Sequence, residues 1–471
     1  MAVLLGSQAA VYLQVASLYF AVALIVAAVQ VARRPIEALW VGFFLLAVTS
    51  QTNPVQLDEL GTSIQGAYRP YILVVVLVAG SMLIGECFGP SRTYGRRSSQ
   101  LTPVWRRFGA FVAAFLLALV FGYFRSFKAF GLTDVLRESS GWITFLLFLL
   151  LGYRLSTSVT ETQLSFTRLR LAVLVYSVFF VTKFVYLSLS LGADQTASGY
   201  GYSQRDAVFF SALVLVLLIA QALASGAIPS WRVTWPAGLV LLLAVLLSGS
   251  RSVLACIVIV TFIFALVWRS KARLRLAILG IVVTLACALL FGAALVLPSQ
   301  DGSQAGVMSY VSNRFLIVSA EDGSLLAHVS EMEAVADAVR ENPVLGKGPL
   351  ASYSYFDPTF GWKESTYLDS GLGYLLMKTG LLGTLIFTWF AMGWLKMAQC
   401  LRTTVPALRL ATLASFVYYL VFLLFGPSFF EFQHAWLVGL VAGHTMMLAS
   451  KFPLVKSGRI PGALNRPVAL A

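Results

Sequence analysis

The chain has 471 residues, of which 59% are hydrophobic and 11% are charged. Soluble domains carry charge on roughly a quarter of their residues, so this composition excludes a soluble globular protein and indicates a polytopic integral membrane protein. The formal net charge of +14 does not indicate a nucleic-acid partner, because the basic residues stand in short clusters between apolar runs, where membrane topology explains them.

The apolar runs are continuous, and many approach the ~20 residues that a helix needs to cross a bilayer. Backbone groups in lipid must be satisfied within a segment, so these runs predict helices, whereas a β-barrel would have short alternating segments. We predict an all-α polytopic membrane protein with 12–13 transmembrane helices, since the second and fifth spans are short and poorly bounded. The expected spans are 12–31, 36–50, 70–88, 107–123, 134–152, 171–192, 206–225, 233–249, 252–268, 276–297, 371–396, 408–425 and 430–450.

The basic residues orient these spans. Of 34 lysines and arginines, the arrangement places 22 on one side and 10 on the other, with Lys183 and Lys378 inside spans. The richer side is cytoplasmic by the positive-inside rule, so residues 298–370 lie outside, in the periplasm if the cell is Gram-negative. No basic region precedes the first apolar run, so we expect no cleaved signal peptide. The expected division is 1–297, N-terminal transmembrane helices; 298–370, a large, partly helical periplasmic loop; 371–453, C-terminal transmembrane helices; and 454–471, a cytoplasmic basic tail.

The outer loop carries ten of the chain's twenty carboxylates, yet its pattern indicates an ordered segment. After Asp322-Gly323, apolar residues recur at helical spacing, which predicts an amphipathic helix of about four turns. Asn342-Pro343 ends this helix, because the residue before a proline avoids helical geometry, and a glycine-rich turn and a folded loop follow. The expected apolar face, opposite Glu333, Asp337 and Glu341, comprises Leu325, Val329, Met332, Val335, Ala336 and Val339.

Cysteines and histidines give no pattern typical of a metal site. The four cysteines contain no CxxC pair, and none falls in the outer loop. His328 is expected at the edge of the apolar face of the loop helix, and His434 and His444 are ten residues apart in the last span. We therefore expect structural histidines, no metal and no cofactor.

Arg251 is the strongest candidate for function. It lies in LSGSRS (247–252), between two apolar runs with almost no loop, on the side where positive charge is disfavoured. A guanidinium recognises phosphate with two hydrogen bonds and keeps its charge, so Arg251 and Arg314 could clamp the two phosphates of a pyrophosphate. The alternatives are that Arg251 snorkels to lipid headgroups and that Arg314 forms a salt bridge with a loop carboxylate.

Two further sets of residues could carry chemistry. Glu364 and Asp369 stand before the next span, where a carboxylate at a dry boundary could act as a general base, although either could instead cap that helix. Lys347, in Gly-Lys-Gly-Pro, is a candidate for binding substrate, although a solvated turn lysine is the more common role. Lys363 and Tyr367 are the other candidate substrate-binding residues.

Three stretches, in order, resemble the O-antigen polymerase and O-antigen ligase superfamily of bacterial envelope glycosyltransferases. LLSGSRSVLA (246–255) is like the S-x-S-R hairpin of that family. The segment from Ser312-Asn313-Arg314 to ENPVLGKGP (341–349) is like the family's loop with arginine, helix and N-P-x-x-G-x-G. ESTYLDSGLGYLLMKTGLLG (364–383) is like the family's segment that ends in a helix with G-x-x-G. The N-terminal half resembles the family only in hydropathy.

The resemblance implies transfer of glycans from undecaprenyl pyrophosphate, with Arg251 and Arg314 holding the pyrophosphate and with neither nucleotide sugar nor metal. The ligase branch typically has His-Asn-x-Tyr-Leu in the third stretch, whereas residues 364–368 are Glu-Ser-Thr-Tyr-Leu. The missing histidine favours a polymerase and leaves Glu364 as a replacement base. The expected partners are lipid-linked glycans, membrane lipids and, from the resemblance alone, a chain-length regulator and a flippase. A ligase for a lipid or protein acceptor and a transporter stay as alternatives, although the sequence has no inverted repeat.

Overall fold

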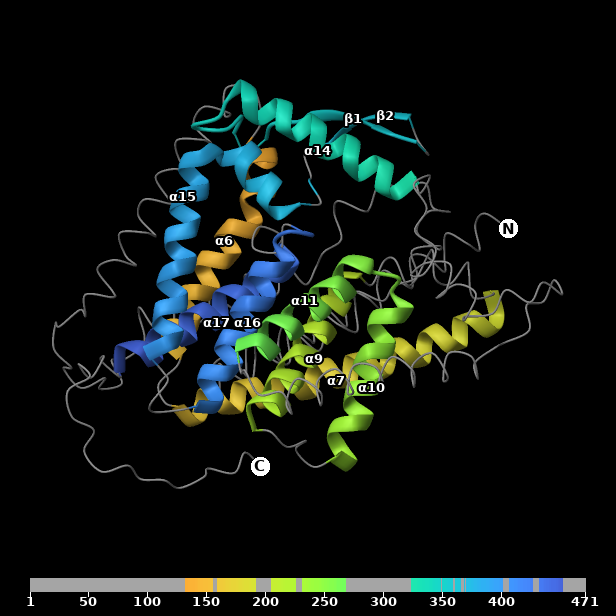
Figure 1. Ribbon diagram of the computed structural model, residues 1–471, viewed down its shortest axis with the longest axis vertical. Helices are drawn as coiled ribbons and strands as arrows, with labels where there is room; N and C mark the ends of the chain where they lie inside the picture. Colours follow the sequence, from red (N-terminus) through yellow and green to blue (C-terminus); the bar gives the residue numbers. More distant parts are fainter. Residues whose placement is uncertain are drawn as a thin grey trace, which may run out of the picture.

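The computed structural model describes residues 132–155, 159–191, 205–225, 231–267, 323–348, 350–358, 361–365, 368, 370–400, 406–426 and 432–451 (Figure 1). The spans expected at 12–31, 36–50, 70–88, 107–123 and 276–297, the tail at 454–471, and three site candidates lie outside these residues. Those candidates are Arg314, Tyr367 and Asp369.

Eight expected spans are helices in the structure, with ends within a few residues of the prediction for all but α7. That helix begins at Val159 instead of near residue 171, because the polar segment before the span contains neither proline nor glycine to break it. The eight helices are α6 (Leu132–Leu155), α7 (Val159–Leu191), α9 (Arg205–Ser225), α10 (Trp231–Leu247), α11 (Arg251–Val267), α15 (Gly371–Cys400), α16 (Pro406–Phe422) and α17 (Phe432–Lys451).

Two helical segments, Phe166–Ser188 and Gly371–Gln399, are long and apolar enough to cross a membrane. The other six apolar helices of the described residues have shorter apolar windows, such as Thr234–Leu247 and Arg251–Leu266. Side chains such as Leu171 and Phe262 are exposed on these helices, as expected for surfaces that face lipid. The described helices are those of an integral membrane protein.

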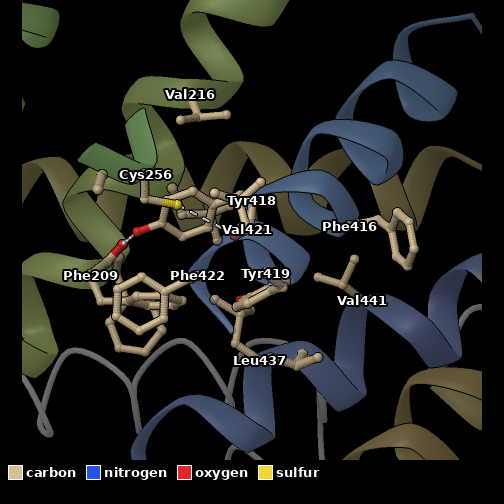
Figure 2. Packing of buried hydrophobic residues seen from close by; sticks show 14 of the residues in the cluster. Phe209, Val216, Cys256, Phe416, Tyr418, Tyr419, Val421, Phe422, Leu437 and Val441 are labelled. Carbon is tan, nitrogen blue, oxygen red and sulfur yellow. Dashed lines mark hydrogen bonds between the residues drawn. The ribbon is translucent and has the colours of Figure 1, made fainter. Parts of the chain in front are cut away.

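The helices pack in two groups. In one, α9 contacts α7, α10, α11 and α16. Aromatic rings fill its centre, where Phe209 lies 4.5 Å from Phe422 and 4.9 Å from Tyr418 between ring centroids (Figure 2). The Tyr418 hydroxyl donates to the Phe209 carbonyl at 3.0 Å, so the buried hydroxyl is satisfied. The ring of His434 packs on Phe209 at 4.2 Å, which agrees with the structural role expected for that histidine.

In the other group, α6 and α17 pack together along most of their length, although they are far apart in the sequence. Three glycines allow this contact, because a Cβ on any of them would meet a backbone oxygen. The clash would be 2.4 Å for Gly152 with Leu440, 2.4 Å for Gly439 with Phe145 and 2.2 Å for Gly443 with Leu149. Small residues have this role in membrane helices generally, because backbones must approach closely to gain dispersion energy.

The outer segment forms α14 (Gly323–Glu341) and a hairpin of β1 (Tyr353–Asp357) and β2 (Gly361–Ser365). Both lie across one end of the helices, next to the top of α15 in Figure 1. The strands pair antiparallel, with Tyr353 opposite Ser365 and Asp357 opposite Gly361. The predicted helix and its end before Asn342-Pro343 are confirmed. The hairpin corrects the expected all-α fold class: the stretch around Asp357-Pro358 and Gly361, expected as a folded loop, is the turn between two short strands.

The expected apolar face of α14 was wrong in part. Val329, Met332 and Ala336 are exposed, whereas Glu331, Val335 and Ala338 are buried against β1 and α15. The prediction merged two neighbouring stripes of the helix. The stripe that is buried includes a carboxylate, so a pattern of apolar residues alone could not select it.

Candidate functional site

Arg251 is the first residue of α11 and is half-buried. The turn before it is built by Ser248, Gly249 and Ser250. Gly249 has a φ of 66° and donates to the Leu246 carbonyl at 3.0 Å, which closes the end of α10. Ser250 is the N-cap residue of α11, since the Leu254 N–H donates to its carbonyl at 3.2 Å. The S-G-S-R sequence thus joins two packed helices by a minimal turn and places a guanidinium at a helix N-terminus.

A cation in the first turn of a helix opposes the helix dipole, which costs ~0.3–1 kcal/mol. An anion at this end would reverse that cost, because the backbone N–H groups and the guanidinium both attract it. The position of Arg251 is therefore typical of a residue that binds an anionic group.

The second and third stretches of the resemblance are joined by backbone hydrogen bonds around a break in α15. Gly380 interrupts α15 with a φ of 65° and a ψ of −166°. The N–H groups of Leu381 and Leu382 donate to Pro343 and Val344 at 2.8 and 3.1 Å, instead of to the preceding turn of their own helix. The carbonyls so released, those of Met377 and Lys378, accept from Lys347 and Gly348 at 2.8 and 3.1 Å. The loop after α14 thus exchanges hydrogen bonds with the interrupted helix.

Only glycine fits at the centre of this interlock, by which we mean residues 343–348 bonded to 377–382. A Cβ on Gly346, whose φ is 69°, would lie 2.6 Å from the Gly380 nitrogen, and one on Gly380 would lie 2.4 Å from the Gly346 nitrogen. The N-P-x-x-G-x-G pattern and the glycine of K-T-G therefore serve to join the outer segment to α15.

The two lysines of this region have protein partners. The Lys347 ammonium pairs with the Glu341 carboxylate at 2.6 Å. Lys378 was expected inside a span without an identified partner. It is buried, donates to the Ala351 carbonyl at 2.8 Å and lies 5.6 Å from the centre of the Tyr374 ring.

Glu364 and Lys363 lie on β2. Lys363 pairs with Asp357 across the hairpin at 2.8 Å. Glu364 is exposed and accepts a hydrogen bond from the Ser352 hydroxyl at 2.5 Å. Its surroundings therefore differ from the dry boundary that we expected for a general base. Ser370 supplies the cap of α15, since its hydroxyl accepts from the Gly373 N–H at 3.2 Å.

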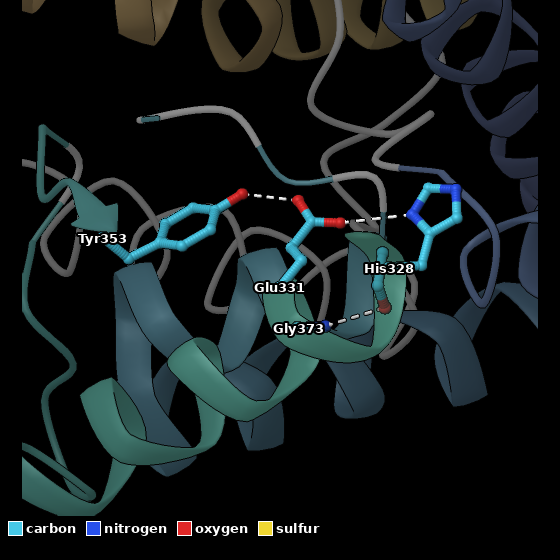
Figure 3. Close-up of polar contacts among 5 residues, drawn as sticks. His328, Glu331, Tyr353 and Gly373 are labelled. Carbon is cyan, nitrogen blue, oxygen red and sulfur yellow. Dashed lines mark hydrogen bonds and ion pairs between the residues drawn. The ribbon is translucent and has the colours of Figure 1, made fainter. Parts of the chain in front are cut away.

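Sequence reasoning missed a polar network on the buried side of α14 (Figure 3). The Glu331 carboxylate accepts from the Tyr353 hydroxyl at 2.5 Å with one oxygen, and its other oxygen lies 3.4 Å from His328 Nδ1. Burial raises the pKa of Tyr353 well above its ordinary value, and the hydrogen bond to Glu331 and its negative charge raise it further. The available signal was the i, i+3 spacing of His328 and Glu331, together with the tyrosine beyond the turn.

The apolar helices are those of a membrane protein, and its candidate site residues lie at the α10–α11 turn and on the outer segment that is bonded to α15. Residues 236–388 match the protein family described as O-Antigen ligase, and this range contains Arg251, α14 and the interlock. The match supports the resemblance to the O-antigen polymerase and O-antigen ligase superfamily that the sequence motifs indicate, and it implies a membrane enzyme of polysaccharide assembly. No curated protein matches the chain.

Proposed function

We propose that this protein is a polysaccharide polymerase of the bacterial inner membrane. It transfers the growing glycan from one undecaprenyl pyrophosphate to the non-reducing end of another lipid-linked repeat, at the periplasmic face. The observation that carries the proposal is the position of Arg251, a half-buried arginine at the N-terminus of α11 inside the family-matched range. The product is a surface polysaccharide, such as an O-antigen, a capsule or an exopolysaccharide.

The chemistry suits two fixed cations. Negative charge grows on the pyrophosphate as the glycosidic bond breaks, and a cation that is already in place stabilises that charge without reorganisation. Arg251 supplies one such group, and Arg314, which is within the same matched range, is the second candidate. Lys347, Lys363 and Tyr367 are the candidate residues for the remainder of the substrate, and Glu364 or Asp369 is the candidate base named by the sequence.

Polymerase is preferred to ligase because residues 364–368 lack the histidine of the ligase pattern. The ligase alternative, in which the acceptor is a lipid or a protein, rests on the same family match. A chain-length regulator and a flippase are proposed as partners, since a polymerase of this kind needs its repeats on the outer face and its product length limited.

Arg251→Ala and Arg251→Lys, in protein purified into lipid and supplied with lipid-linked repeats, test the proposal. We expect Arg251→Ala to lose ~10²-fold or more in rate, the usual effect of removing one donor to a developing oxyanion. Lysine keeps the charge but not the two-pronged geometry, so Arg251→Lys should retain part of the activity. The matched control is Arg340→Ala, because Arg340 is an exposed arginine of α14 whose guanidinium pairs with the exposed Asp337. Full activity of Arg251→Ala in this assay would remove Arg251 from the site.

A deletion strain separates the three candidate functions. Loss of long chains with accumulation of single lipid-linked repeats indicates a polymerase. Long chains retained on undecaprenyl pyrophosphate indicate a ligase. A repeat that is trapped at the cytoplasmic face, with no repeat reaching the outer face, indicates a transporter.

A further inference from the structure

A buried carboxylate in the outer segment has no part in the function proposed above. Glu331 is only 7% exposed, although α14 could have presented it to water as it does Glu333. A buried ionised carboxylate is costly unless both oxygens are engaged, and here one oxygen contacts Tyr353 and the other contacts His328. The arrangement thus places a buried carboxylate directly beside an imidazole.

The two partners of Glu331 differ in exposure and in chemistry. Tyr353 is buried and its raised pKa keeps the phenol protonated, so it acts only as a fixed donor to the carboxylate. The side chain of His328 is 50% exposed, so the imidazole extends from the buried pair towards the surface. Figure 3 shows the three side chains in one line, with the carboxylate between the phenol and the imidazole.

The contact with Glu331 favours one tautomer of the His328 imidazole. An ionised carboxylate can only accept hydrogen bonds, so the tautomer that fits this contact has its proton on the Nδ1 that faces Glu331. The lone pair of the neutral ring is then on Nε2, the nitrogen directed away from Glu331. A carboxylate behind an imidazole also stabilises the imidazolium that forms when Nε2 takes a proton.

We infer that His328 is the general base that deprotonates the acceptor sugar hydroxyl, and that Glu331 and Tyr353 are positioning residues that orient it. This assignment rests on the proposed glycosyl transfer. The acceptor oxygen bonds to the anomeric carbon of the donor glycan, and its proton passes to His328 Nε2. The bond between that carbon and the pyrophosphate oxygen breaks, and its electron pair leaves with undecaprenyl pyrophosphate. The imidazolium then returns the proton to water.

His328 suits this step better than the carboxylate on the hairpin. Glu364 is exposed, and its carboxylate accepts a hydrogen bond from the Ser352 hydroxyl. The His328 ring, by contrast, is held by a buried anion that is itself held by a buried phenol. The ammonium of Lys378, on α15, donates to the Ala351 carbonyl of the loop before β1.

The test uses the full-length protein in lipid, with lipid-linked repeats as substrate, and measures kcat and KM for His328→Ala and Glu331→Gln. We expect kcat to fall ~10²–10⁴-fold for His328→Ala, the usual contribution of a general base, with KM unchanged. Added imidazole should restore part of that loss, since it can enter the space left by the side chain. Glu331→Gln keeps the shape and removes the charge, so it should lower kcat and resist rescue.

Glu333→Gln and Met332→Ala are the matched controls, because both residues are exposed on the same helix. Wild-type kcat in His328→Ala would overturn the inference, as would an increase in KM with unchanged kcat, which would make His328 a binding residue. Both results leave polymer formation by the unaltered protein intact, so the proposed function would survive them. If neither the unaltered protein nor Arg251→Ala forms polymer in this assay, the proposed function itself is rejected. The assignment of His328 is then rejected as well, because it rests on that function.

Discussion

Single positions in this protein show how a charge is made tolerable or useful by its neighbours. Lys378, Glu331 and Asp357 are each buried and each has a partner within 2.8 Å. Arg251 stands at a helix N-terminus, where the dipole disfavours it. This position at the start of α11 supports the proposed role of Arg251 in binding an anionic group.

The network around Glu331 predicts a pH effect on stability. The fold raises the pKa of Tyr353 from its ordinary 10.0, so the unfolded chain loses this proton first. The stabilisation is therefore complete below about pH 10 and is lost as the pH rises above it. We expect the melting temperature of the unaltered protein to fall more steeply than that of Tyr353→Phe as the pH rises above about 10.

The same substitution has a second consequence at neutral pH. Phenylalanine leaves one oxygen of a buried carboxylate without its donor, which costs ~1–3 kcal/mol. Tyr353→Phe should therefore melt at a lower temperature than the unaltered protein at pH 7, as measured by a fluorescence melt in lipid or detergent. Tyr355→Phe, on the same strand, is the control and should melt close to the unaltered protein. Equal melting of all three proteins would mean that the hydrogen bond to Glu331 carries no net stability.

Among helices and strands, the interlock is the feature with the sharpest mechanical consequence. Gly380→Ala places a Cβ 2.4 Å from the loop backbone. It also puts alanine in a positive-φ backbone conformation that costs ~1–3 kcal/mol for residues other than glycine. Gly346→Ala meets the same obstacle from the loop side. We expect either change to lower the melting temperature and to expose the segment after α14 to proteolysis.

The control for these two changes is Gly393→Ala, further along α15, where nothing lies within 4 Å of the added Cβ. Alanine in that helical position should be neutral or stabilising by ~0.5–1 kcal/mol. An unaltered protease pattern in Gly380→Ala would contradict the interlock, since its hydrogen bonds could not survive a Cβ at that position.

Helices were predictable where the relevant forces are local. The bounds of α9, α10, α11 and α14 follow from apolar length, capping residues and proline, and these elements lie within two residues of their expected ends. The break at Gly380 was not predictable, because residues 371–400 form one apolar run and the partners that replace the lost hydrogen bonds are more than thirty residues earlier. His328 and Glu331 were hidden for a related reason, since the stripe that packs inward includes a carboxylate whose donor is on another element.

Long-range contacts then tie the ends of the described chain together. α6 and α17 are separated by most of the described sequence, and the glycines at 152, 439 and 443 let them meet backbone to backbone. α15 contacts α14, α16 and α17, so the interlock connects the outer segment to the same helices. α11, which begins at Arg251, packs on α16, and α14 packs on α15, which also contacts α16. Both sets of residues are thus borne by helices of one packed assembly.

The orientation of that assembly decides whether the site can meet its substrate, since the proposed function requires α14 and the hairpin to face the periplasm. Trp362 is 76% exposed on the hairpin and is a suitable position for a label. With the four native cysteines replaced by alanine, Trp362→Cys should react with a membrane-impermeant maleimide added to cells whose outer membrane alone has been opened. Ser457→Cys, in the C-terminal tail, should react only after the inner membrane is broken.

Each labelling result bears on the mechanism through the location of the substrate. A repeat that has crossed to the outer leaflet presents its pyrophosphate and sugars at that face, so Arg251 and His328 can act only if the outer segment is there too. The reverse labelling pattern would place the hairpin in the cytoplasm. Polymerisation at the periplasmic face would then be excluded. The orientation predicted from the basic clusters would also be wrong, because the excess of lysine and arginine would lie on the periplasmic side.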